Sequence, residues 1–178
     1  AFEPALYADA AARHRCAVSW VGHPSVEQLP ARDPADVDPA LYGLLPGSRP
    51  AELARHLPVF LDAAARVRHA HPGARFLVPL SDDMAAAAGP MPEGLTRVPA
   101  GTDQLRRCRA VLSKSGTSTL ELALLGVPQV VAHRVGAVTW AVGSQLVTGV
   151  RHLALPNILA GEEVVPEHRQ ALDPAALA

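Results

Sequence analysis

Short apolar runs recur along the chain and are separated by polar or helical segments. Each run is too short for a helix, ends at Gly, Pro or Ser, and favours β-branched or leucine side chains, which is typical of buried strands. The runs predict strands in CAVSWVG (16–22), LYGLL (41–45), RFLVPL (75–80), GLTRVPAG (94–101), Ala110–Ser113, Gln129–Ala132 and HLALPN (152–157).

Helical spacing dominates the segments between these runs. The clearest case forms one apolar face, with Leu53, Leu57, Phe60, Leu61, Ala64 and Val67 three or four residues apart. We also expect helices at 102–108, opened by Thr102 or Asp103, at Thr117–Leu125 and at 137–150. Strands that alternate with helices and carry no regular polar positions favour a parallel sheet covered on both faces. The sequence therefore predicts a Rossmann-like α/β fold.

Composition excludes several classes of function. A chain of 178 residues is most simply one domain, and a formal net charge of −1 gives no reason to expect a nucleic-acid partner. Cys16 and Cys108 lack CxxC spacing, which fits a reducing cytoplasm. No apolar run is long enough to span a bilayer. The eight histidines are scattered, so we expect no metal site.

Two predicted strands end in polar turns, LLPGSR (44–49) and LSKSGTS (112–118). Ligands of open parallel sheets bind beyond the carboxyl ends of the strands. Glycines there let the backbone approach a ligand, and the amides and hydroxyls of a helix N-terminus can bind an anion. Ordinary helix capping explains the same residues equally well: Pro50 suits a first helical turn, and STLE (118–121) matches a capping box. The residues alone leave both readings open.

Glu121 carries the same ambiguity. It can be the acid of the capping box, or it can accept both hydroxyls of a ribose whose diphosphate lies at the helix N-terminus. The established nucleotide motifs do not decide the question, because the chain contains neither G-x-G-x-x-G nor a complete P-loop around Lys114. It also lacks the G-x-S-x-G of a hydrolase elbow.

Three segments in this order resemble the lipid-A-disaccharide synthase family: LPGSR (45–49), SGTSTLELALLGVPQVVAHR (115–134) and LPNILAGEEVVPE (155–167). The resemblance extends from Phe2 to Ala178 and includes AFEPALY and VGHP. It implies a GT-B glycosyltransferase, which has two Rossmann-like domains with the active site between them. Residues 1–40 would then be the end of the N-terminal domain and the interdomain linker. Residues 41–178 would be the UDP-sugar-binding domain, incomplete at its C-terminus.

The resemblance also implies an inverting reaction of UDP-2,3-diacylglucosamine with 2,3-diacylglucosamine 1-phosphate, without a cofactor. In this family pattern Arg49 contacts and stabilises the leaving diphosphate, and Glu121 binds the ribose. The remaining donor-binding residues would be Gly47, Ser48, Ser115, Gly116, Thr117 and Asn157. The general base would come from the N-terminal acceptor domain, outside this chain. The implied location is the cytoplasm, peripherally at the cytoplasmic face of the inner membrane.

Other hypotheses remain. Within the GT-B fold, the rivals are enzymes like the peptidoglycan N-acetylglucosaminyltransferase or a UDP-sugar 2-epimerase. Two hypotheses involve no catalysis. The chain could be a UDP-binding module, or it could be a Rossmann-like domain without a nucleotide site, in which the polar residues only cap helices. The segment LPNILAG followed by VVPE argues against the two enzyme rivals.

Overall fold

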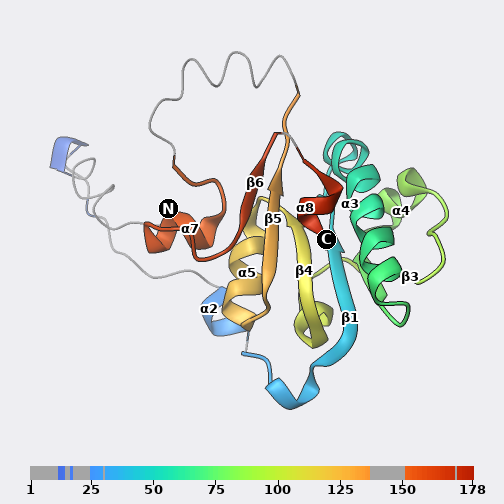
Figure 1. Cartoon of the computed structure of the whole chain (residues 1–178). Helices are drawn as coiled ribbons and strands as arrows, with labels where there is room; N and C mark the ends of the chain where they lie inside the picture. The colour runs from blue at the N-terminus through green and yellow to red at the C-terminus, as the bar shows by residue number, and fades with distance from the viewer. Residues whose placement is uncertain (1–11, 15–16, 18–24, 30, 137–150, 171) are drawn as a thin grey trace.

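The computed structural model describes residues 12–14, 17, 25–29, 31–136, 151–170 and 172–178. Its centre is a six-stranded sheet in the order β3-β2-β1-β4-β5-β6, and all neighbouring strands are parallel (Figure 1). The strands are β1 (Asp38–Leu45), β2 (Arg75–Pro79), β3 (Leu95–Val98), β4 (Cys108–Lys114), β5 (Gln129–His133) and β6 (Glu167–Arg169). The predicted parallel, Rossmann-like sheet is therefore confirmed.

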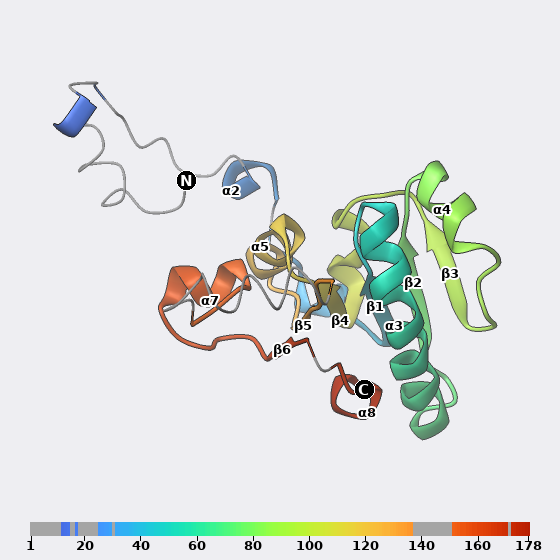
Figure 2. The same ribbon diagram turned by 90° about the horizontal axis from the view of Figure 1, so that it is seen from above.

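Helices cover both faces of this sheet, as a parallel sheet requires. They are α2 (Ser25–Gln28), α3 (Pro50–Ala70), α4 (Asp82–Ala88), α5 (Thr117–Leu125), α7 (Leu155–Ala160) and α8 (Pro174–Leu177), with 3-10 helices η1 (Pro34–Asp36) and η2 (Asp103–Arg107). In Figure 2, α5 and α8 lie on opposite sides of the strands. The bounds of α5 are those expected from the sequence.

The core divides into two clusters because successive strand residues point to opposite faces. On one face, Leu44 of β1 and Leu112 of β4 pack with Phe60 of α3. On the other face, Val111 of β4 packs with Leu122 of α5 and with residues of η2. Strands β1, β2 and β4 thus contribute apolar side chains to both clusters, which is why their sequences show no polar alternation.

The C-terminal part differs from the prediction. Residues 152–157 do not form a strand: 151–154 have no regular structure, and α7 begins at Leu155 with a proline in its first turn. The last strand is β6, which pairs with β5 through Val131–Glu167 and its neighbours. Its sequence, EHR, has no apolar run, because an edge strand buries less of its surface. Helix α4 was also not predicted.

Two predicted elements, the strand at 16–22 apart from Ala17 and the helix at 137–150, lie outside the described residues. The domain boundary at residue 40 likewise stays a prediction. The strand order places the topological switch point between β1 and β4, since the chain runs outward from β1 in one direction and from β4 in the other. In this fold class, a crevice for ligands opens at that point.

Candidate functional site

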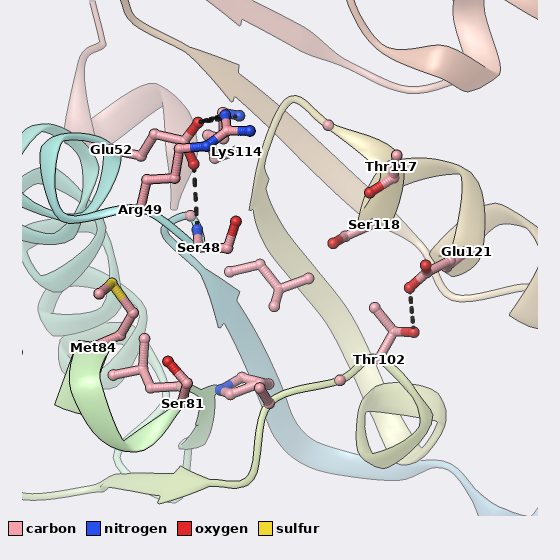
Figure 3. Close-up of a pocket in the computed structure, with 17 residues that line it drawn as sticks. Ser48, Arg49, Glu52, Ser81, Met84, Thr102, Lys114, Thr117, Ser118 and Glu121 are labelled. Atoms are coloured by element: carbon pink, nitrogen blue, oxygen red, sulfur yellow. Dashed lines mark hydrogen bonds and ion pairs between the residues drawn. The ribbon is translucent and has the colours of Figure 1, made fainter.

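A pocket of about 420 Å³ opens at the carboxyl ends of β1 and β4 (Figure 3). Its walls come from the turn after β1, the ends of β2 and β3, and the β4–α5 elbow, so segments far apart in sequence meet there. The lining residues are Leu45, Gly47, Ser48, Arg49, Glu52, Pro79, Leu80, Ser81, Met84, Ala100, Gly101, Thr102, Lys114, Gly116, Thr117, Ser118 and Glu121. The pocket coincides with the topological switch point of the sheet.

The β4–α5 elbow turns the start of α5 toward the pocket. Gly116 is the N-cap of α5, and no side chain caps the helix. The side chains of Thr117 and Ser118 lie on the pocket side of the helix (Figure 3). The N–H groups of a first helical turn have no intrahelical acceptor. Among the described residues, none accepts from the Thr117 or Ser118 N–H group. This helix start can therefore donate to an anion.

The capping-box reading of STLE is wrong. Because Gly116 is the N-cap, Ser118 is the second residue of the helix and cannot cap it. Glu121 lies one turn further on and accepts a hydrogen bond from the Thr102 hydroxyl, with 2.7 Å between Oγ1 and Oε2. Thr102 is the N-cap residue of η2 and is buried. Within the described part of the chain, no other group donates to Glu121, so one carboxylate oxygen faces the pocket without a partner.

The turn after β1 is built around Glu52. Gly47 has φ +123°, and a Cβ at this position would lie 2.6 Å from the Glu52 Cβ, so only glycine fits. The Ser48 N–H donates to Glu52 Oε2 at 3.2 Å. Arg49 is the N-cap residue of α3, with Pro50 in the first turn as predicted. Its side chain is 78% exposed, and its Nη1 lies 3.2 Å from Glu52 Oε1. It can therefore turn toward a ligand without leaving a buried site.

Two charged residues of this pocket, Glu52 and Lys114, were not predicted as site residues from the sequence. Lys114 ends β4, and its Nζ lies 3.0 Å from Glu52 Oε1. Burial alone would raise the pKa of the Glu52 carboxyl. The Lys114 hydrogen bond and charge, the Ser48 N–H and the Arg49 charge outweigh burial and hold this pKa below its usual value. Lys114 could have been predicted as a site residue, since it is the single lysine among 16 Lys and Arg residues and directly precedes the elbow.

Two of the eight predicted site residues do not line the pocket. Ser115 is buried, and its hydroxyl donates to the Leu153 carbonyl at 2.8 Å. Asn157 is fully buried in α7. Its Oδ1 accepts from the N–H groups of Val164 and Val165, and its Nδ2 donates to the Val165 carbonyl and to Glu167. Both side chains are thus occupied in holding the segment that follows residue 151. Their predicted donor contacts remain predictions.

The other six predicted residues, Gly47, Ser48, Arg49, Gly116, Thr117 and Glu121, come together in the pocket. Within the described residues, no three His, Cys, Asp or Glu side chains are placed to hold a metal ion. A helix long and apolar enough to cross a membrane is not found in the same part of the chain. The arrangement offers cationic and amide donors on one side and a carboxylate acceptor on the other. It suits a ligand that has both anionic and hydroxyl groups.

Comparison with known proteins identifies related sequences. The family model described as lipid-A-disaccharide synthetase matches residues 1–175. The lipid-A-disaccharide synthase of Geobacter metallireducens is 39% identical over an alignment of 165 positions, which covers 84% of this chain and 43% of the relative. That of Neisseria gonorrhoeae is 36% identical over an alignment of 187 positions, which covers 95% of this chain and 47% of the relative. The chain thus spans less than half the length of these curated relatives.

Among solved structures, that of the glycosyltransferase VinC in complex with dTDP aligns with a TM-score of 0.44 and 18% identity. The alignment covers 89% of this chain and 35% of that one.

Proposed function

Because the chain belongs to the lipid-A-disaccharide synthetase family, we propose that it forms the donor-binding part of an inverting glycosyltransferase. The donor would be UDP-2,3-diacylglucosamine and the acceptor 2,3-diacylglucosamine 1-phosphate. The products would be lipid A disaccharide 1-phosphate and UDP. Since this chain spans less than half of its relatives' length, we assign the acceptor-binding domain and the general base to the remainder of such a protein. Attachment to the cytoplasmic face of the inner membrane is part of the same proposal.

The observation that carries this proposal is the chemistry of the pocket at the β1–β4 switch point. Glu121 offers a carboxylate oxygen that no described residue uses, which suits the paired hydroxyls of a ribose. The α5 N-terminus offers N–H donors for phosphate oxygens, and its helix dipole favours negative charge. Arg49 can add a bidentate contact to the diphosphate.

In this arrangement the chain's own residues assist departure of the nucleotide. As the bond from the sugar to the diphosphate breaks, negative charge grows on the leaving oxygen. Donors fixed in place before the reaction stabilise that charge most in the transition state. The amides of Thr117 and Ser118 are fixed in this way, and Arg49 joins them once it turns toward the ligand. The acceptor hydroxyl must lose its proton to a base on the opposite side of the sugar, within hydrogen-bond reach.

Calorimetric titration of the chain with UDP in the presence of EDTA tests the binding half of this proposal. We expect binding without a divalent cation, because Arg49 and the helix start neutralise the diphosphate. Binding that appears only after Mg²⁺ or Mn²⁺ is added would contradict the assignment of these residues to the diphosphate. Equal affinity for UDP and for uridine would contradict it as well.

Catalysis requires a second experiment. We expect the chain alone to form no disaccharide from labelled acceptor. A fusion that restores a family acceptor domain should be active and should lose activity on Arg49→Ala. Turnover by the chain alone would show that the general base lies within these 178 residues.

A further inference from the structure

One carboxylate in the pocket, that of Glu52, receives hydrogen bonds from three donors, two in the turn after β1 and one at the end of β4. The two oxygens of this carboxylate accept from different donors. Oε2 accepts from the Ser48 N–H at 3.2 Å and so holds the turn after β1. Oε1 accepts from Arg49 Nη1 at 3.2 Å and from Lys114 Nζ at 3.0 Å. The same carboxylate therefore fixes the backbone with one oxygen and pairs with two cations through the other.

This arrangement places an anion where the proposed function requires one. The charged residues that line the pocket are Arg49, Lys114, Glu52 and Glu121, two cations and two carboxylates. Since Oε1 of Glu52 occupies both cations, an incoming phosphate must compete with it for them. Because the Glu52 side chain is only 16% exposed and that of Lys114 21%, water screens their attraction less than it would on an open surface. The competition therefore affects ligand affinity.

The position of Lys114 indicates which phosphate it meets. Glu121 and Thr102 lie at one end of the pocket, Lys114 and Arg49 lie at the other, and the side chains of Thr117 and Ser118 project between them (Figure 3). Lys114 Nζ is 3.7 Å from the point that a Cβ on Gly116 would occupy, so the ammonium adjoins the N-cap of α5. A nucleotide whose ribose lies at Glu121 thus has its inner phosphate at the helix start and its outer phosphate beside Lys114.

We propose that Lys114 binds the outer phosphate of a nucleoside diphosphate, and that Glu52 is an internal anion that holds Lys114 until this phosphate displaces it. The proposal rests on the proposed nucleotide site and adds to it both a phosphate-binding residue and a competitor. Exchange breaks only the contacts of Oε1, because the Ser48 N–H stays on Oε2. On release of the nucleotide, Glu52 recovers Lys114 and favours departure of the product.

The first turn of α3 that carries Glu52 is fixed independently of the pocket. His56, 1% exposed, has Nδ1 2.9 Å from the Glu52 carbonyl oxygen, and its Nε2 accepts from the Arg134 N–H at 3.2 Å. These contacts require the neutral ring with its proton on Nδ1. Burial, together with the Lys114 and His133 charges, lowers the pKa of His56, even though the Glu52 carbonyl bond raises it. The backbone of Glu52 thus stays in place when its side chain releases Lys114.

The test compares three probes, UDP, UMP and inorganic diphosphate, by calorimetry on the chain and its variants. We expect Lys114→Met to weaken UDP and diphosphate about tenfold, as for the loss of one charge-assisted contact, and UMP less than about twofold. Lys114→Arg should retain most of the affinity for UDP. Glu52→Gln should tighten UDP and diphosphate about three- to tenfold, because its amide oxygen still accepts from Ser48 while the competing charge is gone.

Arg75→Met is the matched control. Arg75 also pairs with a carboxylate, that of Asp38, but both residues lie at the amino ends of their strands, away from the pocket. It should change none of the three affinities. Thermal melting establishes that each variant is folded. If Lys114→Met does not fold, Glu52→Gln still decides the proposal, because it should tighten UDP and diphosphate whereas Lys114→Arg leaves UDP affinity close to that of the wild type.

Two results would overturn it. If Lys114→Met weakens UDP and UMP equally, Lys114 does not distinguish the outer phosphate. If Glu52→Gln weakens UDP, Glu52 serves only to shape the turn. A third result separates this inference from the proposed function: diphosphate that binds and depends on Lys114, without any binding of UDP, would refute the nucleotide site and leave the anion site intact.

Discussion

Two carboxylates at the carboxyl-terminal edge of the sheet show how similar sequence motifs acquire opposite roles. Glu167, with a side chain 2% exposed, accepts from the Leu153 and Ala154 N–H groups, from Asn157 Nδ2 and from Arg169 Nε. Glu121 accepts only from Thr102 among the described residues and faces a pocket. Both follow polar, motif-like segments. The first is saturated by its own chain, whereas the second has capacity left for a ligand.

Counting the hydrogen bonds of each carboxylate therefore distinguishes a structural residue from a candidate ligand-binding residue, which the sequence motifs do not. A buried polar group is costly unless it is paired, so a fully paired cluster such as that of Glu167 and Asn157 stabilises the loop that contains it. A carboxylate that lines a cavity with one oxygen unused has no such structural requirement. Substitutions in the α7 cluster should therefore alter stability, and substitutions in the α5 elbow should alter binding.

The largest effect is expected from Glu167→Ala. It removes the carboxylate acceptor that two N–H groups, the Asn157 amide and the Arg169 guanidinium share, and should lower the free energy of unfolding by about 3–5 kcal/mol, as for the loss of one partner of a buried ion pair. Urea unfolding at pH 7 measures this. An unchanged unfolding midpoint would mean that the carboxylate is dispensable to the fold.

The pH dependence of stability gives an independent measure of the same carboxylate. Burial raises the pKa of Glu167, but the bonds from Ala154, Leu153 and Arg169 outweigh it, so the pKa in the folded protein lies below the ordinary value of 4.5. Its contribution to stability is therefore complete above pH 4.5 and is lost as the pH falls through the lower folded pKa. In Glu167→Gln the fall in stability below pH 4.5 should be shallower than in the wild type.

Asn157→Ala should rank second. Its side chain makes three hydrogen bonds to the loop after α7 and one to Glu167 of β6, and their loss should cost about 2–3 kcal/mol of stability. UDP affinity, measured on the folded fraction, should change less than about threefold, since an effect below about 0.7 kcal/mol is expected for a residue outside the pocket. A tenfold loss of affinity in a fully folded variant would instead support the direct donor contact predicted from the sequence.

Glu121→Gln should produce the reverse pattern. The amide offers a weaker acceptor to ribose hydroxyls, so UDP affinity should fall by about 1–2 kcal/mol, while inorganic diphosphate affinity stays the same. Stability should change by less than about 0.5 kcal/mol, because Thr102 keeps an oxygen acceptor. If both ligands weaken equally, or only the melting temperature falls, the ribose assignment is wrong.

The smallest effect is expected from Ser118→Ala. Because Gly116 rather than Ser118 caps α5, loss of the hydroxyl should change the free energy of unfolding by less than about 0.5 kcal/mol. A capping serine would cost about 1 kcal/mol, so thermal and urea unfolding distinguish the two. A loss of that size would restore the capping-box reading and weaken the contrast between the two carboxylates.

The helices and strands that could be predicted from the sequence are those that short segments specify through their own apolar runs and glycines. Helix α5 has its predicted bounds because Gly116 and Gly126 end the apolar run on either side, and strands β1, β2, β4 and β5 follow from short buried runs. The turn after β1 and the elbow before α5 were also predicted as site elements. Parallel strands with their carboxyl ends at one edge necessarily bring such turns close together.

Which polar residues face the pocket depends on contacts between distant parts of the chain, and these could not be predicted from the sequence. The contact of Lys114 with Glu52 joins residues 62 apart, and it exists because β4 lies beside β1 in the sheet. Strand β6 has no apolar signal and forms only because the edge of β5 offers it a partner. Asn157 and Glu167 form hydrogen bonds with a loop whose path is set by that pairing. The spacing of apolar residues along a segment predicts which of its side chains are buried. Whether a polar side chain has all its hydrogen bonds depends on neighbours from other segments, which it meets only on folding.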